Sequence, residues 1–312
     1  MLVCLLLSAC HYGQLNQQAN APPKDSILFN SVKTGLVIEP MGIKEYHLAT
    51  GQLTSWQQGE SVQHYANGVT LFLQRCGDSV HQVMMSDMTG KVVSLTSCSD
   101  KVTNPTQMRE FAFNGYPTRF KSAHLSPDQS HLAVDAFYYD QRYFHRIHIF
   151  DINGEHRIYF DGSTPQWLPD GRLLFIHQDQ FFIADRSLQH AALINTEIVL
   201  DGHIQNPAIH PSGQYFVFEY NREIWRMNIN GQQIARVLVS HRPLRFPTWS
   251  PDGTMLAFLS GSWGEDIIDQ AEKIIVTYHL AQQTFTSYSL EHLLETDMAP
   301  WPPISWIKGS SR

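Results

Sequence analysis

The sequence predicts an all-β protein, a six-bladed β-propeller of four-stranded antiparallel blades. The first supporting observation is a Pro-Asp-Gly turn between an aromatic strand and an apolar strand, clearest at Pro251-Asp252-Gly253. Related turns contain Pro127, Pro169 and Pro211, so the four prolines are spaced by 42, 42 and 40 residues. Self-similarity at this period in strand-rich sequence is typical of propeller blades.

A second turn, of the form Asp-x-x-Gly, alternates with the first and fixes the number of blades. Its six clear or weak copies end at Gly51, Gly90, Gly154, Leu188, Gly231 and Gln283. Each follows a turn of the first type, the two N-terminal ones being at Gly35 and Gly68. We name the strands of a blade a to d from the centre outward; the first turn then joins a to b and the second joins c to d. Six pairs predict six blades, with five or seven as alternatives because the N-terminal pairs are the least regular.

The ends of the chain are expected to close the ring. Residues 303–306 resemble the start of an innermost strand with no blade after it, and they are a candidate to complete the first blade. An open ring would leave an unpaired strand edge, so we expect the two termini to pair. Which terminus supplies which strand stays open at this point.

The turn sequences at Ser250-Pro-Asp-Gly253 and Leu168-Pro-Asp-Gly171, with the Asp-x-x-Gly turns behind them, resemble the repeats of TolB-type propellers. The resemblance is strong over residues 118–290 and looser over 26–100. It implies a propeller that binds at its loop face. TolB, of the envelope-spanning Tol–Pal system, also has an α/β domain for which this chain has no room. The resemblance is therefore to the repeat and not to TolB itself.

The N-terminus resembles a bacterial lipoprotein signal, since the apolar run ends in Leu7-Ser-Ala-Cys10. This predicts a signal peptide at 1–9, a lipidated Cys10, a flexible Gln/Asn/Pro-rich tether at 10–25 and a single propeller domain at 26–312. His11 is not the Asp associated with inner-membrane retention, which favours the periplasmic side of the outer membrane. No Lys or Arg precedes the apolar run, so a start codon set too late and a plain apolar N-terminus are alternatives.

Cys76 and Cys98 are a candidate disulfide, because an even pair of cysteines in an exported protein favours a bridge. Two strand spacings are about 10 Å, whereas bridged Cα atoms lie within about 7 Å, so the flanking loops must bend together. Two buried free thiols are the alternative.

The longest insertions fall in the b–c and d–a connections, which share one face of a propeller. They are residues 137–145, 260–273 and 99–121. Tyr, Trp and Arg dominate protein-interface hot spots, and long loops in compact folds are usually functional. The alternative is that these side chains cap the blade edges. The candidate binding residues are Arg109, Tyr138, Tyr139, Arg142, Tyr143, His145, Trp263, Glu265 and Asp266.

Composition and motifs give little support for other chemistry. The net charge of −7 is spread without long runs, which argues against nucleic acid binding. No metal or other cofactor is expected, since the sixteen histidines lack ligand spacing; His203, His210 and His241 are a weaker candidate set at the channel mouth. Asp135 and Glu219 are a candidate carboxylate pair for glycoside hydrolysis, although we expect them to face solvent or pair with Arg.

The sequence therefore favours a non-catalytic, lipid-anchored, monomeric propeller that binds an envelope protein through its b–c/d–a face. The question of enzyme activity stays open. The alternative is a carbohydrate-active enzyme, either a lyase or a glycosidase, or a lectin that uses the central channel. Histidines or carboxylates converging at the channel mouth would favour that alternative, and an aromatic rim over a plugged channel would favour a protein partner.

Overall fold

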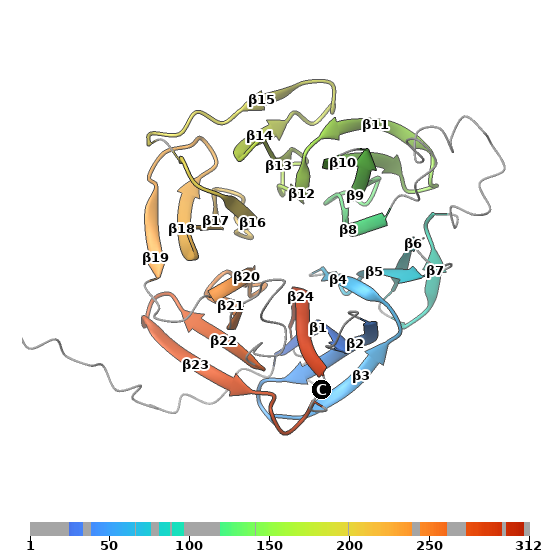
Figure 1. Cartoon of the computed structure of the whole chain (residues 1–312), viewed down its shortest axis with the longest axis vertical. Coiled ribbons are helices and arrows are strands. Elements are labelled where there is room, and N and C mark those ends of the chain that lie inside the picture. The colour runs from blue at the N-terminus through green and yellow to red at the C-terminus, as the bar shows by residue number, and fades with distance from the viewer. Residues whose placement is uncertain are drawn as a thin grey trace, which may run out of the picture.

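The computed structural model is a ring of six sheets, each made of four antiparallel strands (Figure 1). It describes residues 25–308 except 34–38, 66, 76–80, 88, 97–118, 141, 199, 239–243, 261–272 and 295–297. Strands and turns make up this described part, and no helix in it is long and apolar enough to cross a membrane. The prediction of an all-β, six-bladed propeller is confirmed.

The blades follow one another around the ring, and within each blade the innermost strand is named first. Blade 1 is β24 (Met298–Ile307), β1 (Ser26–Lys33), β2 (Glu39–His47) and β3 (Leu53–Gln57). Blade 2 is β4 (Glu60–His64), β5 (Thr70–Arg75), β6 (His81–Ser86) and β7 (Val92–Ser94). Blade 3 is β8 (Arg119–Leu125), β9 (His131–Asp140), β10 (Arg142–Asp151) and β11 (His156–Asp161).

The last three blades are the most regular. Blade 4 is β12 (Ser163–Trp167), β13 (Leu173–His177), β14 (Gln180–Ala184) and β15 (Ala191–Leu193). Blade 5 is β16 (Ile204–Ile209), β17 (Tyr215–Tyr220), β18 (Glu223–Asn228) and β19 (Ala235–Leu238). Blade 6 is β20 (Leu244–Trp249), β21 (Met255–Ser260), β22 (Ile274–His279) and β23 (Thr284–Ser289).

The C-terminal strand closes the ring. β24 is the innermost strand of blade 1 and pairs antiparallel with β1, from Ser26 opposite Ile307 to Lys33 opposite Met298. The expectation that residues 303–306 complete the first blade is confirmed. The predicted role of Gly35 is wrong: it lies outside the described residues, but the segment containing it connects β1 to β2, the second and third strands of the blade.

The Pro-Asp-Gly turns form because each residue fills a defined role. At the turn after β20, the N–H of Gly253 donates to the carbonyl of Ser250 at 2.8 Å, and Asp252 accepts from the N–H of Thr254 at 3.0 Å. Gly253 has φ of +72°, and a Cβ there would lie 2.3 Å from the His210 ring of blade 5. Glycine is therefore required by the turn and by the neighbouring blade.

The core lies between blades rather than inside them. Six clusters of buried apolar side chains occur in the described part of the chain, one at each interface between neighbouring blades. Between blades 4 and 5, for example, the ring of Phe181 meets those of Phe216 and Phe218 at centroid distances of 4.9 and 5.0 Å. The b strands are therefore buried on both faces, whereas outer strands such as β23 are mostly exposed.

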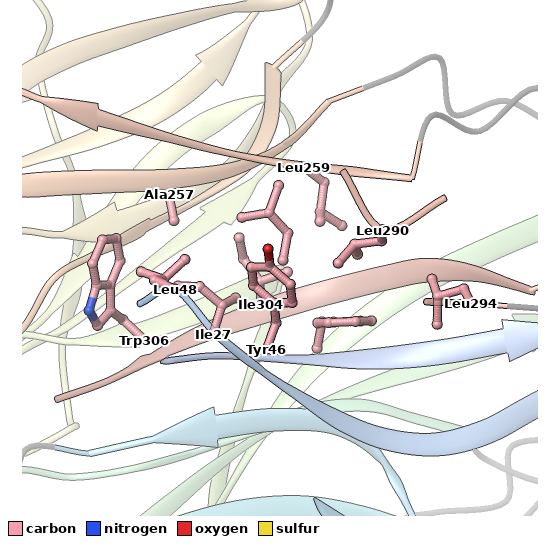
Figure 2. Close-up of a cluster of buried hydrophobic side chains, with 11 residues drawn as sticks. Ile27, Tyr46, Leu48, Ala257, Leu259, Leu290, Leu294, Ile304 and Trp306 are labelled. Atoms are coloured by element: carbon pink, nitrogen blue, oxygen red, sulfur yellow. The ribbon is translucent and has the colours of Figure 1, made fainter. Parts of the chain in front are cut away.

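Tryptophans at the ends of innermost strands tie neighbouring blades together. The indole N–H of Trp167 donates to the carbonyl of His124 in blade 3 at 3.1 Å, and that of Trp249 to the carbonyl of Ala208 in blade 5 at 2.9 Å. Trp306 of β24 donates instead to Asp25 at 2.7 Å, ahead of β1. Its side chain is part of the cluster that joins blades 1 and 6 (Figure 2).

Trp306→Ala is expected to destabilise the protein by about 3–5 kcal/mol, because it removes a buried aromatic side chain and its hydrogen bond at the ring closure. Leu293→Ala is the control, since Leu293 is 42% exposed and should change stability by less than about 0.5 kcal/mol. Urea unfolding followed by circular dichroism measures both. Equal stabilities of the two variants would contradict the importance of this closure.

Candidate binding site at the channel mouth

A cavity of about 1,380 Å³ lies at the centre of the ring and is lined by residues of all six blades. Many of these residues stand in the first half of an a strand, such as Glu60 and Gln205, or in the second half of a b strand, such as Leu73 and Phe137. The a strands begin and the b strands end at the face that carries the d–a and b–c connections. The cavity therefore belongs to the face on which the sequence predicts binding.

The predicted insertion in blade 3 is a hairpin rather than an irregular loop. β9 and β10 have ten residues each, against six or fewer for the b and c strands of blades 4 to 6, and their pairing continues to Arg142 opposite Asp140. Tyr138, Tyr139, Arg142 and Tyr143 all lie in these strands. The register pairs Tyr139 with Tyr143, two residues beyond the pair of Phe137 and His145, which lines the cavity.

Several other predicted residues lie outside the described part of the chain, and the predictions for them stay predictions. They are the candidate binding residues Arg109, Trp263, Glu265 and Asp266, the candidate disulfide Cys76 and Cys98, and the candidate lipidation site Cys10.

Asp135 and His145 form a hydrogen-bonded pair on the cavity wall. Nδ1 of His145 lies 2.8 Å from Oδ1 of Asp135, and Oδ2 of Asp135 accepts the backbone N–H of Thr164 in blade 4 at 3.0 Å. The Asp135 side chain is 1% exposed and that of His145 is 26% exposed. Burial alone would raise the pKa of Asp135, but the hydrogen bond and charge of His145, the charge of Lys121 and the Thr164 N–H together lower it. The carboxylate is therefore held in its ionised form.

Glu219 occupies the equivalent place in blade 5, behind the cavity wall. It accepts hydrogen bonds from the side chain of Asn206 at 2.8 Å and from the backbone N–H of Phe246 in blade 6 at 2.6 Å. Burial raises the pKa of Glu219, and these bonds with the charge of Arg245 only partly oppose it. The expectation that Asp135 and Glu219 face solvent is wrong, since both are buried and bonded to the next blade.

The donors to these two acids sit in bulges of the innermost strands. Thr164 and Phe246 have φ of +51° and +56°, and the register of β12 and of β20 shifts there. A positive φ is unusual for residues with such side chains and needs support from the surrounding structure. The bonds to Asp135 and Glu219 supply that support.

These bulges are not among the features predicted from the sequence, although the sequence contains a signal for them. A proline follows the bulged residue in Thr164-Pro165, Asn206-Pro207 and Phe246-Pro247, always four residues before the turn proline or its equivalent. Proline lacks an N–H and so fits a position where the ladder is interrupted.

The histidines do not converge on one metal position. His203 pairs with Asp179 at 2.7 Å before β16, whereas His210 follows β16 and stacks on Tyr215 at 4.3 Å. Six strand residues separate them, which corresponds to about 20 Å, and His241 lies outside the described residues. Among the described residues, no group of three or more His, Cys, Asp or Glu side chains is placed to hold a metal ion.

Comparison with solved structures shows a fold likeness over most of the chain. A protein assigned as TolB from Agrobacterium tumefaciens has a TM-score of 0.55 and 16% identity, covering 86% of this chain and 89% of its own. A chain of a nidogen/laminin complex has a TM-score of 0.59 and 9% identity, covering 90% and 98%. A chain of hydrazine synthase from Kuenenia stuttgartiensis has a TM-score of 0.60 and 10% identity, covering 93% and 48%.

No protein-family model matches the sequence, and no curated protein matches it. At these identities the likeness concerns the fold, and unrelated functions share folds of this kind. The resemblance to TolB-type propellers is thereby confirmed at the level of the fold.

Asp135→Asn and Glu219→Gln are expected to change stability with opposite pH dependence. Because folding lowers the pKa of Asp135, its ionised carboxylate stabilises the folded state. This stabilisation is present above the pKa of the unfolded state, about 3.9, and is lost as the pH falls through the pKa of the folded state. Asp135→Asn should therefore cost about 1–3 kcal/mol at neutral pH and less in acid. Because folding raises the pKa of Glu219, its protonated form stabilises the folded state. This stabilisation is present below the pKa of the unfolded state, about 4.3, and is lost as the pH rises through the pKa of the folded state. Glu219→Gln should therefore gain on the wild type as pH rises.

Urea unfolding of both variants between pH 3 and pH 8, a range of about five units around the ordinary carboxyl values, measures this. Parallel pH profiles for the two variants would contradict the assignment of opposite shifts.

Proposed function

We propose that this chain is a non-catalytic binding module of the bacterial envelope, tethered to the periplasmic side of the outer membrane through a lipid on Cys10. It binds a protein partner through the face formed by the b–c and d–a connections. The lipoprotein-like sequence at residues 7–10 supports the anchor, and the TolB-like fold agrees with an envelope location.

The extended hairpin of β9 and β10 carries the proposal for the binding face. Each strand exceeds its counterparts in blades 4 to 6 by about four residues, or about 13 Å, at the end next to the cavity mouth. The added stretch holds three tyrosines and an arginine within six residues, a composition typical of protein-interface hot spots. A rigid ring that presents such a hairpin needs little reordering on binding, which favours affinity.

A photo-crosslinking amino acid at Tyr143 is expected to capture one dominant envelope protein in cells. The matched control is the same probe at Asn153, an exposed residue in the turn at the opposite end of β10. Gel shift and mass spectrometry identify the adducts. The same adduct from both positions, or none from Tyr143, would refute the proposed face.

Replacing Cys10 with Ala is expected to abolish incorporation of an alkyne-labelled fatty acid and to release the protein from the membrane fraction. Cys4→Ala is the control, because Cys4 lies in the segment expected to be removed with the signal peptide. Fractionation with in-gel detection of the label measures both. Full labelling of the Cys10→Ala protein would remove the anchor from the proposal.

A further inference from the structure

The pair of Asp135 and His145 presents a defined hydrogen-bonding group at the cavity wall. An ionised carboxylate only accepts hydrogen bonds, so Nδ1 of His145 must carry the proton that lies between the two residues. In the neutral form of the imidazole Nε2 is then an acceptor, whereas in the imidazolium form, whose charge lowers the pKa of Asp135, Nε2 is a donor. The neutral form is the one that can accept a hydrogen bond from a ligand. Within the described part of the chain, Nε2 of His145 has no hydrogen-bond partner, and the residue lines the cavity.

Two of the acidic side chains on the cavity wall near His145 have a partner. Asp161 accepts from Arg146 at 3.0 Å, and Asp179 pairs with His203 at 2.7 Å. The exposed Lys121 adds a positive charge that acts on the buried carboxylate of Asp135. Asp161 and Asp179 are thus engaged within the wall, which leaves hydrogen bonds and apolar contact as further means of recognition there.

The rest of the wall combines aromatic faces with groups that both donate and accept hydrogen bonds. The ring of Phe137 lies against that of His145 with centroids 4.9 Å apart, and Phe144 also lines the cavity. Thr164 and Ser61 also line the cavity, but their hydroxyl oxygens are buried and have no hydrogen-bond partner in the described structure, so they are not among the groups that a ligand meets. The amides of Gln166, Gln178 and Gln205 line the same space. The cavity of about 1,380 Å³ exceeds the roughly 300–1,000 Å³ of usual small-molecule pockets.

We propose that the channel cavity is a glycan-binding site, separate from the protein-binding hairpin rim, in which Nε2 of His145 accepts a hydrogen bond from a sugar hydroxyl and Asp135 positions the imidazole. Sugars present dense hydroxyl donors and acceptors on rings with apolar C–H faces, which matches a wall of amides, imidazoles and phenyl rings. The volume suits several linked neutral sugars rather than one.

The test is binding of three neutral tetrasaccharides, chitotetraose, cellotetraose and maltotetraose, to the full chain by saturation-transfer NMR and calorimetry. At least one is expected to bind, and His145→Asn is expected to weaken it about tenfold. Asparagine keeps a donor near the position of Nδ1, so Asp135 stays satisfied, but it removes the acceptor at Nε2. His190→Asn is the matched control, because His190 pairs with Asp185 at 3.4 Å in the turn between β14 and β15, away from the cavity.

The Asp135→Asn variant tests whether Asp135 sets the tautomer of His145, which a purely structural role of Asp135 would not affect. Long-range ¹⁵N NMR should show the Nδ1–H form of His145 in the wild type, and its loss in Asp135→Asn together with weaker sugar binding. The absence of binding by all three sugars, equal binding by His145→Asn, or an Nε2–H form in the wild type would each overturn the proposal. The crosslink from Tyr143 is expected to persist in His145→Asn, so failure of the glycan site and failure of the protein-binding face are distinguishable.

Discussion

Closure of the ring is the constraint on which the rest of the structure depends. A blade alone cannot bury its two faces, because its apolar side chains are completed only by a neighbour on each side. The cluster between blades 1 and 6 draws Ile27 from the N-terminal part, Ala257 and Leu259 from blade 6, and Ile304 and Trp306 from β24. Without β24, blade 1 would lack its innermost strand and this interface would open, which leaves both an apolar face and a strand edge exposed to water.

The bulges of the innermost strands show how the same contacts shape the channel. Each bulge removes an N–H from the strand ladder, and a buried N–H requires another acceptor. Asp135 and Glu219 provide it across the blade boundary for Thr164 and Phe246. The second oxygen of Asp135 accepts a hydrogen bond from His145, which lines the cavity. Glu219 instead accepts its side-chain hydrogen bond from Asn206. The same arrangement, a buried carboxylate bonded to a bulge of the next blade, thus orients a partly exposed histidine in blade 3 and is fully buried in blade 5.

The parts of this fold that are predictable from sequence are those set by local chemistry. A four-residue turn dictates the residue type at a position such as Gly253, so the number of blades can be counted from the turns in the sequence. The pairing of β24 with β1 joins residues far apart in sequence, which is why the strand order of blade 1 and the place of Gly35 are not derivable. The spacing of the turns predicts an insertion at residues 137–145 but not whether it is a loop or a hairpin. The Tyr and Phe residues in it favour extended strands. The burial of Asp135 and Glu219 depends on the next blade, and no local pattern shows it.

The position of Asp135 also determines what kind of recognition the cavity wall supports. Because its charge is buried behind the ring of His145 and satisfied by two donors, a ligand in the cavity meets the imidazole and not the carboxylate. An exposed carboxylate would attract cations and bind water strongly, whereas an imidazole oriented by Asp135 offers a single ring nitrogen, Nε2, with a fixed direction. Since the same carboxylate bonds to Thr164, this nitrogen is held by the contact that joins blades 3 and 4. The packing of blades 3 and 4 therefore also fixes the direction of the His145 ring on the cavity wall.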